Sequence, residues 1–326
     1  FDDLPEQNVV TWSALIDGYA QHQLCDEALK CFRQMQDAGI CPNAATYVSI
    51  LKVCGIVGSL DIGEDVNAEV RRQGLLNKNV VLGTALVEMY FKCGALEKAL
   101  ELFEELQERN VVTWNAVIDG YARHGRGDEA LKFFRRMQDE RICPNVFTYV
   151  CVVKACGILG CRNSAEDIDA EVRKEGLLLQ NNVVLGGALV DMHAKCGALE
   201  KAQEVFEQLP VRNVVAWSAL ITGYAQLGEA HVVLELYRGM KLEGITPDSV
   251  TFIVLLTACS RTGMVVEGEK LFDEMHAMYH ITPTLEHYTC MIDLFGRAGH
   301  FDKAKAMLDE VQYSEHLPLL LSILGA

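Results

Sequence analysis

The sequence has little positive charge: 29 lysine and arginine residues face 45 aspartate and glutamate residues, which gives a formal net charge of −16. No global positive field draws such a chain onto nucleic acid or anionic lipid, so any binding of that kind depends on where individual charges lie.

Long apolar runs are also missing. The longest one near an end, "LPLLLSILGA" from Leu317, is far shorter than the roughly 20 residues that span a bilayer, and we expect no membrane anchor.

The short motifs of common catalytic and metal sites are absent as well. The chain contains no C-x-x-C, no G-x-x-x-x-G-K-[ST] and no H-E-x-x-H. His276 and His280 are spaced so that they could share a metal on a helix, but such a pair is more often surface or packing. We therefore predict no enzyme, no cofactor and no metal site.

Cysteine is present, in 12 positions, but several of these recur at fixed offsets: Cys54 with Cys156, Cys93 with Cys196, and Cys41 with Cys143. Recurrence of this kind fits small buried or capping residues in a reducing compartment better than a disulfide framework.

What the sequence has in abundance is repetition. The stretch "VVTWSALIDGYA" from Val9 returns as "VVTWNAVIDGYA" from Val111, and self-alignment gives cycles of three units, the first cycle of 35, 36 and 31 residues. The predicted units are 9–43, 44–79 and 80–110, then 111–145, 146–182 and 183–213, then 214–248, 249–284 and 285–316. Residues 1–8 match the end of the 80–110 unit, so we expect the chain to start inside a truncated unit.

The N-terminus has neither signal-peptide nor transit-peptide character, and we expect any address segment to be missing from this chain.

Each unit has the pattern of two helices. Trp12 and its apolar neighbours recur at helical spacing, and Trp114 and Trp217 occupy the position of Trp12 one and two cycles later. A single helical hairpin cannot cover its own apolar face, so neighbouring units must stack. The predicted fold is all-α, a right-handed superhelical solenoid of helix–turn–helix repeats whose core contains these aromatic side chains.

The segment "VVTWNAVIDGYARHGRGDEALKFFRRMQDERICPN" resembles the pentatricopeptide repeat. In the 9–43 unit Trp12, Leu15 and Tyr19 fit the frame of a tetratricopeptide repeat, but Ile16 stands in place of its glycine. The alternating lengths resemble the plant PLS subclass, and "ALVEMYFKCGALEKALELF" is typical of its S units. The resemblance implies three P-L-S triplets, 9–110, 111–213 and 214–316, followed by the start of an E1-like extension at 317–326. The high identity of the first two cycles fits a designed or consensus-derived chain and equally a recent duplication.

In this family, the resemblance implies, each P or S unit binds one RNA base through the fifth residue of its first helix and the last residue of the unit. The pairs in this chain are Ser13 with Asn43, Thr84 with Asn110, Asn115 with Asn145, Gly187 with Asn213, and Ser218 with Asp248. The family code carried over to them suggests adenine for the first two, a pyrimidine for the third and guanine for the last. Gly187 offers no side-chain hydrogen bond, which leaves its preference open.

The second position of each unit lies on the same helical face as the fifth. It is apolar in the P and S units at Val10, Val81, Val112, Val184 and Val215, and in one L unit it is Phe147. Adjacent apolar side chains could sandwich a base between them, or they could serve only as packing between repeats.

Position thirteen, near the end of the first helix, holds Lys92, Arg123, Lys195, Arg261 and Arg297. One cation per unit could contact a backbone that has one phosphate per nucleotide. A basic residue near a helix C-terminus also stabilises the helix dipole, so both explanations stand.

The L units place Val48, Val150 and Ile253 at position five, where an aliphatic group cannot hydrogen-bond a base. We predict that these units are spacers or partner-binding surfaces. The resemblance implies a protein partner, a multiple organellar RNA editing factor, and a role in C-to-U RNA editing in a chloroplast or mitochondrion. The deaminase motifs H-x-E and P-C-x-x-C do not occur here. The predicted function is sequence-specific binding of single-stranded RNA, and the alternative is a protein-binding scaffold.

Overall fold

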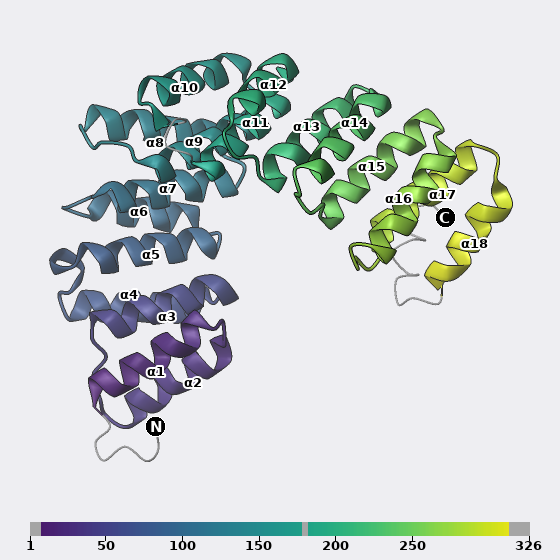
Figure 1. Cartoon of the computed structure of the whole chain (residues 1–326). Helices are drawn as coiled ribbons and strands as arrows, with labels where there is room; N and C mark the ends of the chain where they lie inside the picture. Colours follow the sequence, from purple (N-terminus) through teal and green to yellow (C-terminus); the bar gives the residue numbers. More distant parts are fainter. Residues whose placement is uncertain (1–7, 178–181, 313–326) are drawn as a thin grey trace. The chain divides into compact units, whose positions relative to one another are not determined.

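The computed structural model describes residues 8–177 and 182–312, and every regular element in these ranges is helical. Two helices follow each other along the chain in each predicted unit, as the sequence colours of Figure 1 show. We call them the first and the second helix of the unit.

Residues 1–159 form one compact body. Its helices are α1 (Val9–Gln21), α2 (Cys25–Asp37), α3 (Ala44–Val57), α4 (Leu60–Arg72), the 3-10 turn η1 (Leu76–Lys78), α5 (Val80–Lys92), α6 (Leu96–Glu105), α7 (Val111–Arg123), α8 (Gly127–Asp139) and α9 (Val146–Leu159). The first helices pack in a row, α1 against α3, α3 against α5, α5 against α7, and α7 against α9. Successive units therefore share a continuous core.

Residues 160–326 form the second compact body. Its described helices are α10 (Arg162–Lys174), α11 (Val183–Lys195), α12 (Leu199–Gln208), α13 (Val214–Gln226), α14 (Ala230–Leu242), α15 (Ser249–Thr262), α16 (Val265–Ala277), α17 (Leu285–Arg297) and α18 (Phe301–Gln312). The row of first helices is α11, α13, α15 and α17.

Asparagine and aspartate residues determine where most first helices begin. Asn43 precedes α3 and accepts a hydrogen bond from the Thr46 backbone N–H at 3.0 Å, and Asp248 accepts one from Thr251 N–H at 2.8 Å. A side-chain oxygen at this position satisfies a backbone donor that the helix itself leaves without a partner. The last residue of one unit is thus the N-cap of the next.

The core contains the repeated aromatic side chains, as the sequence predicts. Trp12, Trp114 and Trp217 are at most 5% exposed, and the Trp114 ring meets Phe103 of the preceding unit edge-on, with centroids 4.9 Å apart. Each large ring removes much apolar surface from water, and the edge-to-face geometry adds a smaller electrostatic stabilisation.

A polar contact inside the stack joins α4 to α5. Asn67 Nδ2 donates to the Tyr90 hydroxyl at 2.8 Å, and Arg71, held by two bonds to Glu105, donates from Nε to Asn67 Oδ1 at 3.2 Å.

The corresponding contact between α10 and α11 is charged. Asp169 replaces the asparagine and His193, which is fully buried, replaces the tyrosine, with His193 Nε2 3.4 Å from Asp169 Oδ2. Arg173 Nε donates to both Asp169 oxygens at 3.0 and 3.1 Å. Burial raises the pKa of Asp169, but His193 and Arg173 outweigh burial and lower the pKa overall.

The prediction of an all-α repeat fold is confirmed, and each first helix begins at the first residue of a predicted unit. The grouping of units into triplets stays a prediction. The truncated unit, apart from Asn8, and the E1-like extension lie outside the described residues. Among the helices that the structure describes, none combines the length and apolar character needed to cross a membrane.

Candidate nucleic-acid interface

The fifth residue of a first helix and the last residue of the same unit lie next to each other in this structure, and we call them the polar pair of that unit. A residue of the following unit joins them. It is the third residue of the next first helix, a fully buried threonine at Thr46, Thr113, Thr148 and Thr251, and we call these four the inter-unit threonines.

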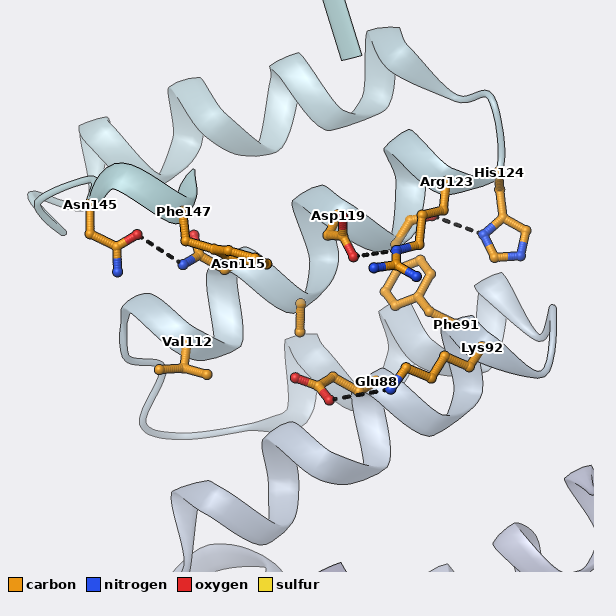
Figure 2. A pocket seen from close by; sticks show the side chains of 12 residues that line it. Glu88, Phe91, Lys92, Val112, Asn115, Asp119, Arg123, His124, Asn145 and Phe147 are labelled. Atoms are coloured by element: carbon orange, nitrogen blue, oxygen red, sulfur yellow. Dashed lines mark hydrogen bonds and ion pairs between the residues drawn. The ribbon is translucent and has the colours of Figure 1, made fainter. Parts of the chain in front are cut away.

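The pair Asn115 and Asn145 shows the arrangement most completely (Figure 2). Asn115 Nδ2 donates to Asn145 Oδ1 at 3.3 Å. Thr148 Oγ1 donates to Asn115 Oδ1 at 2.7 Å, and the Thr148 backbone N–H donates to Asn145 Oδ1 at 2.9 Å. The backbone donor fixes the Asn145 carbonyl, and Asn145 in turn fixes the orientation of the Asn115 amide.

The serine pairs have the same plan. Ser13 Oγ lies 2.6 Å from Thr46 Oγ1, which donates to Asn43 Oδ1 at 3.1 Å. In the second body, Ser218 Oγ lies 3.0 Å from Thr251 Oγ1, and Thr251 donates to Asp248 at 2.6 Å.

Thr84 and Asn110 follow the plan in an S unit. The hydroxyls of Thr84 and Thr113 are 2.7 Å apart, and Thr113 Oγ1 donates to Asn110 Oδ1 at 3.2 Å. Among the five predicted pairs, all of which the structure describes, that of the 183–213 unit departs from it. Gly187 provides no side chain, Ala216 stands where the threonine would be, and Asn213 Nδ2 donates instead to the Val183 carbonyl at 3.2 Å.

Sequence reasoning missed the inter-unit threonines, although a signal was available. Each threonine follows the N-cap Asn or Asp by three residues, and the side chain at that position commonly bonds back to the cap. The pattern predicts the cap, but only the structure brings the threonine to a fifth residue 29 or 33 positions upstream.

A cleft of about 440 Å³ opens at the Asn115 pair. Val112 and Phe147, the second residues of successive units, stand on either side of its polar end, and they are 51% and 53% exposed (Figure 2). The cleft is lined by Glu88, Phe91, Lys92, Val112, Asn115, Ala116, Asp119, Gly120, Arg123, His124, Asn145 and Phe147.

The second body has a cleft of about 340 Å³ at the same repeat positions. Ser218 and Asp248 stand in place of the two asparagines, with Val215 and Val250 as the flanking second residues. The other second residues of P and S units, Val10, Val81 and Val184, are 62–67% exposed. These side chains are accessible to a ligand, which packing between repeats alone would not require.

The predicted phosphate-binding cations are all exposed, but most are paired with an acid one turn earlier. Arg123 Nε lies 2.5 Å from Asp119, Lys195 Nζ 2.6 Å from Asp191, Arg297 Nε 2.9 Å from Asp293, and Lys92 Nζ 4.0 Å from Glu88. Arg261 differs in that it donates to the Ala225 carbonyl at 3.5 Å. The sequence prediction overlooked these acids, which reduce the positive charge offered to a phosphate.

The fifth residues of the L units differ in how accessible they are to a partner. Val48 and Ile253 are half-buried, and Val150 is only 5% exposed. Val150 therefore contributes mainly to packing. Ile56 and Ile158, which are 54% and 47% exposed, are among the exposed apolar groups of these units, and they stand at position thirteen, where the S units have Lys92, Lys195 and Arg297.

The described residues contain no group of three or more His, Cys, Asp or Glu side chains arranged to hold a metal ion. Burial raises the pKa of the Cys54 thiol to about 12 and that of Cys259 to about 11, so both stay protonated at neutral pH and act as packing groups.

Family models described as "PPR repeat family" match residues 7–55, 109–157 and 212–261, and models described as "PPR repeat" match 84–111, 187–214, 250–279 and 286–315. The chain belongs to the pentatricopeptide repeat family. This membership agrees with the prediction that the chain is not an enzyme.

Two similar proteins come from Arabidopsis thaliana. Pentatricopeptide repeat-containing protein At1g50270 is 37% identical over 311 residues, which are 95% of this chain and 52% of the relative. Pentatricopeptide repeat-containing protein At1g06140, mitochondrial, is 35% identical over 95% of this chain and 55% of the relative. The chain thus spans about half the length of the curated relatives it matches.

Among solved structures, the chain is similar to pentatricopeptide repeat protein PPR10 in complex with an 18-nt psaJ RNA element. One such structure has a TM-score of 0.79 at 20% identity and covers 96% of this chain and 46% of PPR10. Another has a TM-score of 0.68 over 94% of this chain and 50% of PPR10. The likeness shows the fold.

Proposed function

We propose that the chain binds single-stranded RNA in a sequence-specific manner, one base for each P or S unit, without catalysing a reaction. The observation that carries this proposal is the recurrence of one cleft in both bodies, with a polar pair at its end and an exposed apolar residue on each side. Bases of a single strand can be stacked between such side chains and hydrogen-bonded on their edges.

The hydrogen-bonding inventory supports the bases assigned to the serine pairs. Thr251 gives its one hydroxyl proton to the Asp248 carboxylate, so the Ser218 hydroxyl must donate to Thr251. Ser218 and Asp248 then offer only acceptors, which suits the two adjacent N–H donors on the Watson–Crick edge of guanine.

Ser13 also uses its proton inside the protein, on the Val9 carbonyl at 2.6 Å or on Thr46, but its partner Asn43 offers an amide donor. One acceptor beside one donor suits the amino group and N1 of adenine.

The asparagine pair is rich in donors. Asn115 uses one of its two N–H donors on Asn145 Oδ1 and keeps the other, and the Asn145 amide nitrogen has two N–H donors of its own. Pyrimidines present carbonyl oxygens on their Watson–Crick edge, and these oxygens accept hydrogen bonds, so the pair favours a pyrimidine.

The finer role rests on family resemblance. We propose that the chain is the PLS-type recognition module of an organellar C-to-U RNA editing factor, in a chloroplast or mitochondrion. A relative whose name carries the word mitochondrial supports an organellar location. The high identity of the first two cycles supports a consensus-derived or recently duplicated sequence.

A second candidate function, protein binding through the L units, is favoured by the exposed Ile56 and Ile158. We propose a multiple organellar RNA editing factor as the partner, contacting these isoleucines together with Val48 and Ile253. Changing Ile56 and Ile158 to lysine should abolish its binding in a pull-down, while lysine at the exposed Val10 of a P unit should not. Retained binding by the double variant would remove these residues from the interface.

RNA binding is tested by fluorescence anisotropy at 100 mM salt. This lies within the range of about 50–200 mM over which affinity that depends on phosphate contacts falls steeply with salt. The labelled RNA carries A-N-A-Y-N-N-G in the 5′ to 3′ direction, one nucleotide for each unit from 9–43 to 214–248. Y is a pyrimidine, and N is any base, placed at the L units and at the 183–213 unit. We expect it to bind more tightly than an RNA permuted at the four coded positions. Equal affinity for both, or no binding with and without the partner, would refute the proposal.

A further inference from the structure

We propose that the inter-unit threonines are positioning residues for base selection, and that the 183–213 unit, which lacks one, accepts any base. This inference rests on the proposed RNA binding and deepens it, because it assigns each base preference to three side chains from two units rather than to the polar pair alone.

The first argument is the position of the hydroxyl. In the four pairs that have it, the threonine Oγ1 lies 2.6–3.0 Å from the fifth residue and within 3.2 Å of the last residue's Oδ1. All four threonines are 0% exposed, so no water replaces either contact. If the fifth side chain rotated away, the buried hydroxyl would keep only its bonds to the last residue, so the rotation costs one buried hydrogen bond.

The second argument is proton direction. A threonine hydroxyl has one proton, and in the Ser218 pair Asp248 takes it. Ser218 must then donate inward and accept from the ligand. In the Asn115 pair the shorter bond of Thr148 goes to the Asn115 amide oxygen, at 2.7 Å against 3.1 Å to Asn145 Oδ1, so the Asn115 amide nitrogen is the group left for the ligand. The threonine thus decides whether the fifth residue offers a donor or an acceptor.

The third argument is the pair without a threonine. Gly187 and Ala216 have no polar side-chain atoms, and a Cβ built on Gly187 would lie 2.7 Å from Asn213 Oδ1. The Asn213 side chain occupies the place of the missing fifth side chain and bonds to Val183. Asn213 is then the one side chain of this pair that can reach a base, and its amide already donates to the Val183 carbonyl and accepts from the Ala216 N–H at 2.9 Å, so a second polar side chain that could distinguish one base from another is missing.

The loss-of-function test uses Thr251→Val, which keeps the shape and removes the hydroxyl. Anisotropy is measured with four RNAs that differ only at the nucleotide of the 214–248 unit. We expect the preference for guanine to fall about ten-fold, the effect of one lost discriminating hydrogen bond, while the salt dependence stays unchanged. The matched control is Thr11→Val. Thr11 bonds Asn8 in the same capping arrangement, and its hydrogen bonds within the described residues are to Asn8 rather than to a fifth residue.

The gain-of-function test is the double variant Gly187→Thr with Ala216→Thr, which copies Thr84 and Thr113. It should create a preference for adenine at the nucleotide of the 183–213 unit, where the starting chain should show less than a two-fold range. Gly187→Thr alone should create a weaker preference. This variant also keeps the proposal testable if Thr251→Val fails to fold.

The outcomes separate the two levels of the proposal. If the unaltered chain does not prefer the coded RNA, the proposed function fails. If it does, but Thr251→Val retains the full guanine preference, or the 183–213 unit already discriminates strongly, the role of the threonines is overturned.

Discussion

The matched contacts at α4–α5 and α10–α11 allow a prediction of how charge inside the stack affects stability. Asp169→Ala removes the only carboxylate that Arg173 contacts among the described ion pairs, and the remaining bond of Arg173 is from Nη1 to Gln208 at 2.6 Å. Losing a hydrogen bond between charged groups costs about 1.5–3 kcal/mol. Asn67→Ala should cost only about 0.5–1.5 kcal/mol, because Arg71 keeps both bonds to Glu105.

The two variants should also differ in their response to pH. The folded-state pKa of Asp169 is lowered, so its carboxylate stabilises the protein above the ordinary pKa of an aspartate, and this contribution disappears as pH falls through the folded-state value. The excess cost of Asp169→Ala over Asn67→Ala, about 1 kcal/mol or more at pH 7.5, should therefore shrink below about pH 4. Asn67 does not titrate, so the cost of Asn67→Ala should stay constant.

The assay is urea unfolding followed by circular dichroism, with the free energy of unfolding of each variant compared with the unaltered chain at pH 7.5 and in steps below pH 4. Because repeat arrays can unfold in stages, hydrogen exchange of α10 and α11 at neutral pH locates the loss. Equal costs for the two variants at pH 7.5, or an excess that does not change with pH, would refute the reasoning.

Three further predictions concern binding and packing. The double variant Asp119→Asn with Asp191→Asn frees Arg123 and Lys195 from their acidic partners, so it should tighten RNA binding at low salt and steepen the slope of log affinity against log salt, whose limit for five phosphate contacts is about −3.5. The control Asp17→Asn should change this slope less, because its partner Gln21 is uncharged. An unaltered slope in the double variant would remove these cations from the interface. Phe147→Ala should weaken RNA binding by about 1–3 kcal/mol, measured by anisotropy, without changing the base preference. Val250→Ala should weaken RNA binding less. Equal losses of binding free energy in the two variants would argue against stacking of a base on the Phe147 ring. Gly120→Ala should destabilise the chain by about 1–3 kcal/mol in urea unfolding, because its Cβ would lie 2.4 Å from the Phe91 ring. Gly18→Ala, where the Cβ meets open space, should stabilise the chain by about 0.5–1 kcal/mol. Destabilisation by both substitutions would contradict this reasoning.

Much of the fold could be predicted from the sequence because its signals are local. Tryptophan at a fixed position of each P unit marks the core, and the asparagine at the end of most units marks the following helix start. Both act within one or two turns of the chain, where residue spacing determines geometry. The structure therefore begins its first helices where the repeats begin.

The candidate site was harder to predict because its contacts join different units. The positions of the polar pairs came from family resemblance, whereas the contact of Thr148 with Asn115 depends on how two helices pack. The same holds for burial: Val48 and Val150 occupy one repeat position, yet only Val150 is buried. A sequence pattern gives the face of a helix and leaves open how closely the next helix covers it.

The contact between each fifth residue and the threonine of the following unit has a consequence for how such arrays can be recombined. The segment that folds as a helical hairpin begins at position one, but the side chains joined around one cleft extend to position three of the next hairpin. Exchanging whole hairpins would therefore separate a fifth residue from its hydroxyl, and a unit moved in front of Ala216 would lose it. Cassettes cut after position three would carry all their hydrogen-bonding partners with them. Crossovers at that point, whether in a gene or in a design, keep each fifth residue together with its last residue and its threonine.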